Sequence, residues 1–416
     1  MRHFRNSFII FLAFSLSGPV SAETEIALDP AVLSHCLARL KASARSKGIR
    51  AETYDFYTRD LAPDPTVLRL LDSQPEFRTP IWDYLAGLID EERVEDGRAR
   101  LRDHRETLDR IAARYKVDPA IVVSIWGVET DYGRVFGQRP IRSSLATLSC
   151  FGRRQNFFRA EFISLLQLLQ NEDIRDEDLK GSWAGAFGHT QFMPSVYARI
   201  AVDEDGDGHR NLVKSIPDAL ASTANYLKQA GWRNDLPWGY EISLPARFDA
   251  GWAGRKKRQP VDVWRERGVQ LIDGTPLPDL DVKAAVLLPA GMEGPAFLLL
   301  PNFDALYAYN PAESYALAIA LLSDRLKGGR GLEAAWPTDD PGLGRKDRRT
   351  LQTLLLQRGH DIGEADGIIG NRTRRAIQIE EKRLGWKKTE GRAGKKILET
   401  LSAEAAQKDA SSDPAD

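Results

Sequence analysis

The stretch Asp118-Pro-Ala-Ile-Val-Val-Ser-Ile-Trp-Gly-Val-Glu-Thr-Asp-Tyr-Gly133 sets a carboxylate within an apolar helix. Its first two residues have the types of a helix N-cap and first helical position. Glu129 follows Val122 and Ile125 at helix spacing, so the three side chains share one face. Loss of water on an inward face raises the pKa of a carboxyl group. The pattern therefore predicts a general acid that can donate a proton near neutral pH.

The alternative interpretation of Glu129 is a structural carboxylate that is half exposed or neutralised by an arginine such as Arg134 or Arg142. Helical spacing alone favours this alternative, because structural ion pairs also perturb pKa values. The other motifs of the chain reverse that preference.

Residues 1–22 have the features of an export signal. A positively charged start precedes an apolar run at 8–16 that is too short to cross a membrane, and Val20-Ser-Ala22 matches a cleavage site. We expect a mature, periplasmic protein that begins at Glu23. No cysteine stands directly after the apolar run, so we expect no lipid anchor there. No later stretch is long and apolar enough to span a bilayer, so we expect no membrane span.

The composition argues against some classes of partner but does not decide whether the two cysteines form a disulfide. Net charge is −1 with both signs mixed, which favours neither nucleic acid nor an acidic membrane surface as a partner. We expect a monomer. Cys36 and Cys150 are the two cysteines. They could form a disulfide in an oxidising compartment or remain buried thiols, and their spacing does not choose between these states.

The 416 residues exceed what one hydrophobic core usually supports, so two or more units are expected. Periodicity predicts mostly helix over 28–180, short strands within 238–300 and a helix at 315–326. The predicted divisions are a signal at 1–22, a first domain at 23–327, a Gly- and Pro-containing linker at 328–342, a compact unit at 343–402 and a disordered tail at 403–416.

A second motif is Gly181-Ser-Trp-Ala-Gly-Ala-Phe-Gly-His-Thr-Gln-Phe-Met-Pro-Ser195. Its glycines permit close approach of the backbone to another group. Ser182 and Gln191 offer hydrogen-bonding groups among aromatic side chains, which suits a site for sugars. The alternative is a tight packing segment, and the motif alone favours neither.

Together the two motifs resemble the membrane-bound lytic transglycosylase B family, lysozyme-like enzymes that cut bacterial peptidoglycan. The similarity covers most of residues 30–327 and includes the aromatic segment Tyr307–Tyr315. It implies a mainly α (α+β) fold: a lysozyme-like catalytic domain with a small β insertion, followed by a small helical domain. Where many relatives carry Gln, this chain has His189. It also lacks the cysteine that carries the lipid anchor, so the words membrane-bound in the family name are not expected to apply to it.

The resemblance implies roles for individual residues. Glu129 matches the single catalytic acid/base. The positions that match the sugar groove are Ser182, Gln191, Tyr309, Asn310 and Tyr315, with Tyr132 beside the acid. Glu129 would protonate the oxygen that leaves N-acetylmuramic acid, and the C6 hydroxyl would then close onto C1. The product is a 1,6-anhydromuramoyl end, formed without water or a catalytic cofactor. Alternatives are a hydrolytic muramidase and a non-catalytic peptidoglycan-binding scaffold.

An acidic loop, Asp203-Glu-Asp-Gly-Asp-Gly-His-Arg-Asn211, matches the opening of an EF-hand. Position 12 is Lys214 rather than the usual Glu. A solvated Asp-Gly turn is the alternative. Relatives carry an enlarged loop whose last ligand comes later, so we expect a structural Ca²⁺ site. Its ligands would be Asp203, Asp205, Asp207, the backbone carbonyl of His209 and Asp218.

The segment Leu351–Ile377 resembles a peptidoglycan-binding domain of the type often attached to wall hydrolases, a small bundle of helices. Its Asp366-Gly367 pair and Gly370 fit turns, and its leucines fit a core. A linker before it fits a tether that raises the local concentration of enzyme on an insoluble polymer. The alternative is a helical bundle without a ligand.

Overall fold

The computed structural model describes residues 27–71 and 79–412. The predicted export signal at 1–22 lies outside the described residues. No helix in the part of the chain that the structure describes has the length and apolarity that crossing a bilayer requires.

The first unit is a helical body, as predicted. Its helices are α1 (Pro30–Ser46), α2 (Ala51–Thr58), α3 (Pro65–Leu71), α4 (Ile81–Ala86), α5 (Glu91–Asp103), α6 (Arg105–Tyr115), α7 (Pro119–Thr130), α8 (Ile141–Cys150), α9 (Gln155–Gln170), α10 (Pro194–Ile200), α11 (Ile216–Gln229), α13 (Pro301–Tyr309) and α14 (Glu313–Leu326). A short antiparallel pair, β1 (Arg139–Pro140) and β2 (Lys180–Gly181), joins two loops.

Helix α7 lies at the centre of this body. Asp118 caps its N-terminus by accepting a hydrogen bond from the N–H of Ala120, and Pro119 is its first residue. Every residue from Ala120 to Thr130 is buried, because α5, α6, α11 and α14 pack around the helix. A helix that is apolar on all sides belongs inside a domain.

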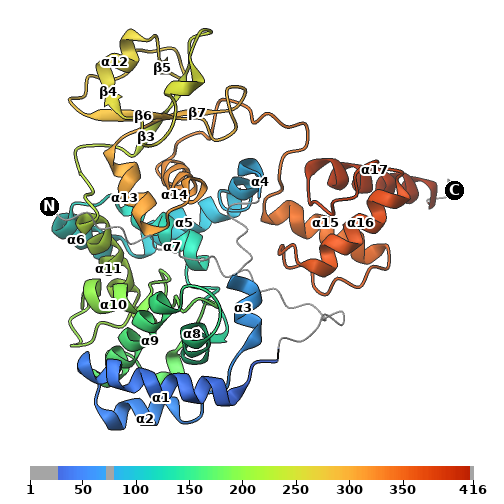
Figure 1. The fold of residues 1–416 in the computed structure, drawn as a ribbon. Helices are drawn as coiled ribbons and strands as arrows, with labels where there is room; N and C mark the ends of the chain where they lie inside the picture. Colours follow the sequence, from blue (N-terminus) through green and yellow to red (C-terminus); the bar gives the residue numbers. More distant parts are fainter. Residues whose placement is uncertain (1–26, 72–78, 413–416) are drawn as a thin grey trace.

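A small antiparallel sheet interrupts the helices between α11 and α13, in agreement with the predicted β insertion. Its elements are β3 (Gly239–Ser243), β4 (Gln259–Pro260), α12 (Val261–Glu266), β5 (Gln270–Leu271), β6 (Lys283–Leu287) and β7 (Ala296–Leu299). The strand order is β4-β6-β7-β3-β5. Trp264, Val286 and Leu298 belong to a core of its own, and Figure 1 shows the insertion projecting from one end of the body.

The third unit is a bundle of α15 (Arg345–Gln357), α16 (Asn371–Arg383) and α17 (Lys395–Ser412) around a separate core that includes Leu351, Leu355 and Ile377. The prediction of a disordered tail from residue 403 is wrong for 403–412, which continue α17. This stretch contains Ala, Glu, Gln and Lys, which are strong helix formers, and Ala405 packs against the bundle core.

Cys36 and Cys150 form a disulfide that joins α1 to α8, with Cα atoms 5.8 Å apart. The structure therefore decides between the two states that the sequence left open. The bond links positions separated by 114 residues, so it restricts the unfolded chain strongly.

The segment 328–342 contains no helix or strand. It contacts both the β insertion and the helical body. The carboxylate of Glu241 on β3 accepts hydrogen bonds from the N–H groups of Glu333 and Ala334, at 3.0 and 2.8 Å. The ring of Trp336 lies 6.5 Å from that of Trp82 on α4. In this structure the segment is a packed connection rather than the free tether expected.

Candidate active site

Glu129 lies in the last turn of α7 with 3% of the residue exposed. Its Oε1 accepts a hydrogen bond from the hydroxyl of Tyr315. Its Oε2 is buried and has no hydrogen-bond partner among the described residues. Burial raises the pKa of Glu129 to about 8, against the lowering effect of the Tyr315 hydrogen bond. The carboxyl group is therefore mostly protonated at neutral pH.

Two buried tyrosines support this acid from α13 and α14. The rings of Tyr309 and Tyr315 are stacked, with centroids 6.4 Å apart and an interplanar angle of 10°. The hydroxyl of Tyr309 donates to the carbonyl of Thr190, at 2.7 Å. Both tyrosines have 0% exposure. They therefore hold Glu129 and connect it to the second motif, rather than presenting open faces for a sugar.

The second motif folds as compact turns beside α7. Ser182 Oγ accepts from the N–H of Ala186 at 3.0 Å. Gln191 has a φ of +51°, and its Nε2 donates to the carbonyl of Gly188 at 2.9 Å. At Gly188, where φ is +80°, a side chain would collide with the carbonyl oxygen of Leu212. The predicted close backbone approach therefore occurs here.

Gln191 also presents an unsatisfied acceptor. Its Oε1 is buried and has no hydrogen-bond partner among the described residues. A buried amide oxygen without a partner is costly unless a ligand or water supplies the missing donor. Gln191 thus has an acceptor available for a hydroxyl or an acetamido N–H.

His189 joins the two motifs, a role that sequence reasoning missed. Its Nδ1 accepts a hydrogen bond from Trp126 Nε1 at 3.1 Å, and its carbonyl accepts one from Thr130 Oγ1 at 2.6 Å. Burial, with a smaller contribution from His104, lowers the pKa of His189 to about 4. The ring is neutral at pH 7, as an accepting nitrogen requires. The departure from Gln was the only signal of this residue in the sequence.

Tyr132 forms its hydrogen bond with α5 and not with the carboxyl group of Glu129. Its hydroxyl donates to the carbonyl of Arg93 on α5 at 2.8 Å, and its ring occupies the space beside Gly127, where a side chain would collide with it. Asn310 ends α13, next to Tyr309, and is 3% exposed.

Asp131 does not serve as a second carboxylate for Glu129. Its oxygens accept hydrogen bonds from Arg345 and Arg134. The pKa of Glu129 is set by burial and by Tyr315, with no contribution from another carboxylate in the described ranges. This differs from the paired carboxylates of most glycosidases.

In the acidic loop, carboxylate oxygens of Asp203, Asp205 and Asp218 converge to within 4.8 Å of one another. Asp218 is 0% exposed, and burial raises its pKa even though it accepts several backbone hydrogen bonds. An oxygen-only set of donors around a buried carboxylate fits Ca²⁺. Asp207 does not belong to the converging group.

The Lys at position 12 has a simple structural explanation. Lys214 Nζ pairs with Asp178 at 2.8 Å and so is engaged outside the loop. Asp218, which follows it, supplies the buried carboxylate instead.

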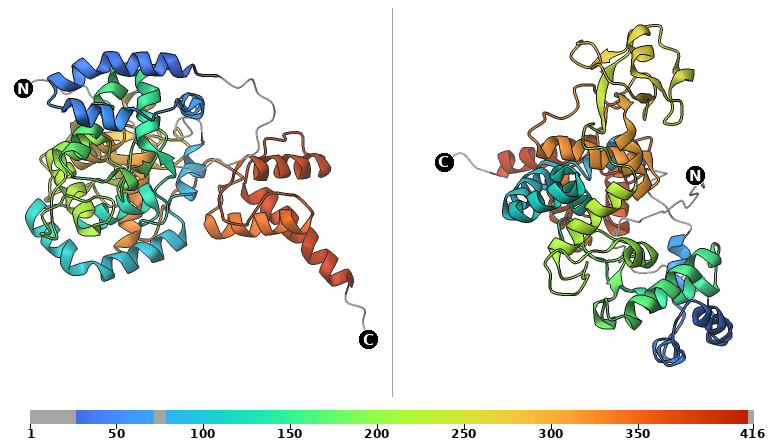
Figure 2. Two further views of the ribbon diagram at one scale, coloured as in Figure 1. Left: turned by 90° about the horizontal axis from the view of Figure 1, so that it is seen from below. Right: turned by 90° about the vertical axis from the view of Figure 1, so that its left-hand side faces the viewer.

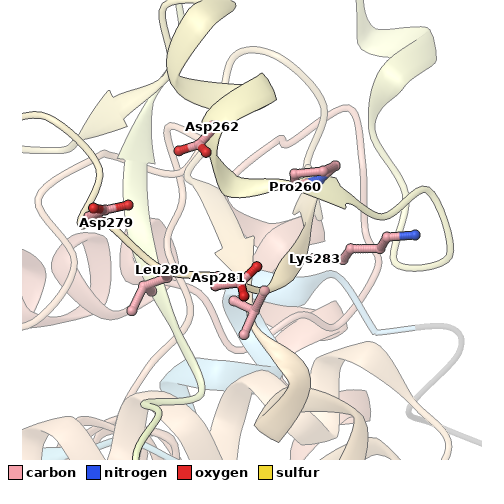
Figure 3. Close-up of a pocket in the computed structure, with 7 residues that line it drawn as sticks. Pro260, Asp262, Asp279, Leu280, Asp281 and Lys283 are labelled. Carbon is pink, nitrogen blue, oxygen red and sulfur yellow. The ribbon is translucent and has the colours of Figure 1, made fainter.

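A pocket of about 430 Å³ lies in the β insertion. Asp262, Asp279, Asp281 and Lys283 are among the residues that line it (Figure 3), and all four are exposed. It belongs to the projecting unit, whereas the convergent buried groups described above lie in the helical body.

Comparison with known proteins places these features in a family. The model of the transglycosylase SLT domain matches residues 33–324, and that of a putative peptidoglycan binding domain matches 344–401. Membrane-bound lytic murein transglycosylase B of Escherichia coli K12 is 34% identical over 264 residues, which are 61% of this chain and 72% of that protein.

Solved structures give the same result for the fold. SltB3 from Pseudomonas aeruginosa in complex with NAG-anhNAM-pentapeptide is 45% identical, with a TM-score of 0.71, and the match covers 89% of this chain and 99% of that one. Escherichia coli lytic transglycosylase Slt35 in complex with calcium is 31% identical, with a TM-score of 0.62, over 70% of this chain and 92% of that one. The predicted mainly helical, lysozyme-like fold is confirmed.

Proposed function

Because this chain belongs to the transglycosylase SLT domain family and is a lytic murein transglycosylase acting on peptidoglycan, we propose that Glu129 is its sole acid/base. The bond cleaved is the β-1,4 bond from N-acetylmuramic acid to N-acetylglucosamine, and the product is a 1,6-anhydromuramoyl end. The observation that carries this proposal is the unpartnered, buried Oε2 of a glutamic acid whose pKa is raised.

The hydrogen bond from Tyr315 supports a proton on the other oxygen of Glu129. Since the Tyr315 hydroxyl donates to Oε1, that oxygen acts as an acceptor and the acidic proton sits on Oε2. Oε2 is the oxygen without a partner. A glycosidic oxygen placed there would receive the proton as the bond to C1 breaks.

The acetamido oxygen of the muramoyl residue then bonds to C1 and stabilises the positive charge that develops there. The Glu129 carboxylate next takes the proton of the C6 hydroxyl, and O6 bonds to C1 as the acetamido oxygen leaves. Glu129 regains its proton, and no water is consumed. Buried surroundings keep both proton transfers efficient, because a pKa near the working pH suits an acid that must also act as a base.

Ser182, Gln191 and Asn310 would line the sugar site, with the free Oε1 of Gln191 accepting a hydrogen bond from the substrate. Tyr309 and Tyr315 would act behind the acid. Tyr132 would support α7 from the side of α5.

Ca²⁺ bound by Asp203, Asp205, Asp218 and the backbone carbonyl of His209 would stabilise the loop before α11 and take no part in the chemistry. The calcium complex of Slt35 supports this assignment. Residues 344–401 would bind the glycan wall, and residues 1–22 would direct export to the periplasm.

The test is to digest purified peptidoglycan and weigh the products. We expect anhydro-disaccharides; products heavier by one water would show a muramidase instead. The variant Glu129→Gln should slow the release of either product by about 10³-fold. Release at the wild-type rate by this variant would reject Glu129 as the acid and leave its family membership intact.

A further inference from the structure

The C-terminal bundle is attached to the helical body through charged side chains. Helix α15 lies beside α4 and α5 (Figures 1 and 2). Arg345, the first residue of α15, has a side chain that is only 15% exposed. Its Nε donates to both oxygens of Asp90, at 3.1 and 3.2 Å. Its Nη1 donates to both oxygens of Asp131, at 2.8 and 3.0 Å.

Asp131 is the residue that ends the acid-bearing helix. It adopts the left-handed conformation, with φ of +50°, and its N–H donates to the carbonyl of Gly127 at 3.0 Å. The same carbonyl accepts a hydrogen bond from Arg93 Nη1, at 2.8 Å. Glu129 lies between Gly127 and Asp131, so guanidinium groups hold both ends of the turn that carries the acid.

Charges in this cluster balance only when the bundle is docked. The carboxylates of Asp90, Asp96 and Asp131 face the guanidinium groups of Arg93, Arg134 and Arg345. Arg345 also pairs with Glu92 at 3.8 Å, and Arg349 pairs with the same carboxylate. Removal of Arg345 would therefore leave four carboxylates with three cations. Because the side chain of Asp90 is only 6% exposed, water cannot easily replace the lost guanidinium.

We propose that Arg345 is a positioning residue for the reaction: through Asp131 it fixes the last turn of α7, so that the docked C-terminal bundle helps to orient Glu129. This rests on the proposed role of Glu129. It assigns the bundle a part in the chemical step that is separate from binding the wall.

The alternative is that the ion pairs only attach the bundle. The interface contains pairs that serve as matched controls, because they attach the bundle without touching α7. Arg349, also on α15, pairs with Glu92 on α5, and Arg392 pairs with Asp83 on α4.

The experiment compares the full-length variants Arg345→Ala and Arg349→Ala on soluble, purified glycan strands. We expect Arg345→Ala to lower kcat about tenfold with KM changed less than about twofold, because a displaced acid weakens the chemical step and not substrate binding. Arg349→Ala should keep kcat within about twofold of wild type.

A double-mutant cycle tests whether Arg345 acts through Asp131. Asn tolerates the left-handed conformation, so Asp131→Asn removes the charge and keeps the backbone. The double variant Asp131→Asn/Arg345→Ala should be no slower than Asp131→Asn alone. Additive losses would overturn the proposal.

Equal losses of kcat in Arg345→Ala and Arg349→Ala, or a rise in KM alone, would also overturn it. Thermal unfolding of each variant shows whether it is folded. If Arg345→Ala is not, the comparison becomes Asp131→Asn against Asp83→Asn, with a loss of kcat expected only in the first and equal values contradicting the proposal. An inactive wild-type protein would instead reject the proposed function.

Discussion

Glu129 on α7 and Glu161 on α9 are buried to nearly the same extent, with 3% and 2% exposed, but their hydrogen bonds differ. Glu161 Oε2 accepts from the N–H of Ser195 at 2.9 Å, and Oε1 accepts from Ser195 Oγ at 2.7 Å. It thereby caps the start of α10, where a negative charge is favourable. Within the described parts of the chain, Glu129 has the Tyr315 hydroxyl as its only hydrogen-bond partner.

Burial raises the pKa of both glutamates. A raised pKa therefore does not by itself mark a catalytic acid, since desolvation acts on any buried carboxyl group. What separates the two is the unsatisfied oxygen of Glu129, which leaves a position for the substrate. Glu161 is therefore a natural control for Glu129.

The largest expected effect is on activity. Glu129→Gln should slow the release of anhydro-disaccharides by about 10³-fold, because an amide cannot donate the proton. Glu161→Gln, assayed under conditions where it is folded, should stay within about threefold of wild type. Similar losses in the two variants would erase the distinction.

The second effect is on stability and its dependence on pH. Glu129 has a folded pKa of about 8 against a reference value of 4.5, so the folded state binds its proton more tightly than the unfolded state. The stabilising contribution of this group to the free energy of unfolding is fully present below pH 4.5 and is lost as pH rises toward 8. The variant Glu129→Gln does not suffer that loss. Relative to wild type, its free energy of unfolding should therefore rise by on the order of 4 kcal/mol between these pH values.

Urea unfolding at pH 4.5 and pH 8 measures this gain. A difference between variant and wild type that does not change with pH would mean that Glu129 ionises normally in the folded protein.

The third effect is a loss of stability, opposite to the gain expected for Glu129→Gln, when Glu161 is replaced by Gln. Glu161→Gln places an amide NH₂ against donors of Ser195, so a buried donor loses its acceptor. We expect a loss of about 2 kcal/mol in the free energy of unfolding at pH 7. Glu177→Gln, an exposed change on the η2 turn (Asp176–Asp178), is the control and should be neutral.

The smallest effect concerns Tyr315→Phe. It removes the hydrogen bond that lowers the pKa of Glu129, so the alkaline limb of the kcat profile should move to higher pH. Loss of orientation should lower kcat by about tenfold. Tyr197→Phe, which removes a buried hydroxyl bonded elsewhere in the body, should leave the profile in place; a profile unmoved in both variants would contradict the role of Tyr315.

Much of the fold followed from patterns that are local in sequence. The predicted helix at 315–326 corresponds to α14, the predicted helical region 28–180 contains α1 to α9, and the strands predicted within 238–300 correspond to β3, β6 and β7. Two-residue strands such as β4 and β5 were missed, because they carry too few side chains for a period to appear. The tail was misjudged because its small, polar residues also favour helix.

The sequence by itself determined the apolar helix that contains Glu129, the Gly-rich motif and the composition of the acidic loop, since spacing and residue type are properties of neighbours along the chain. Only the tertiary structure decided which oxygen of Glu129 has a partner, that Glu161 is satisfied and that Cys36 meets Cys150. It also brought Arg345 to the end of α7, across 214 residues. Hydrogen bonds and charge pairs act over a few ångströms in space, so no pattern along the chain could reveal these contacts.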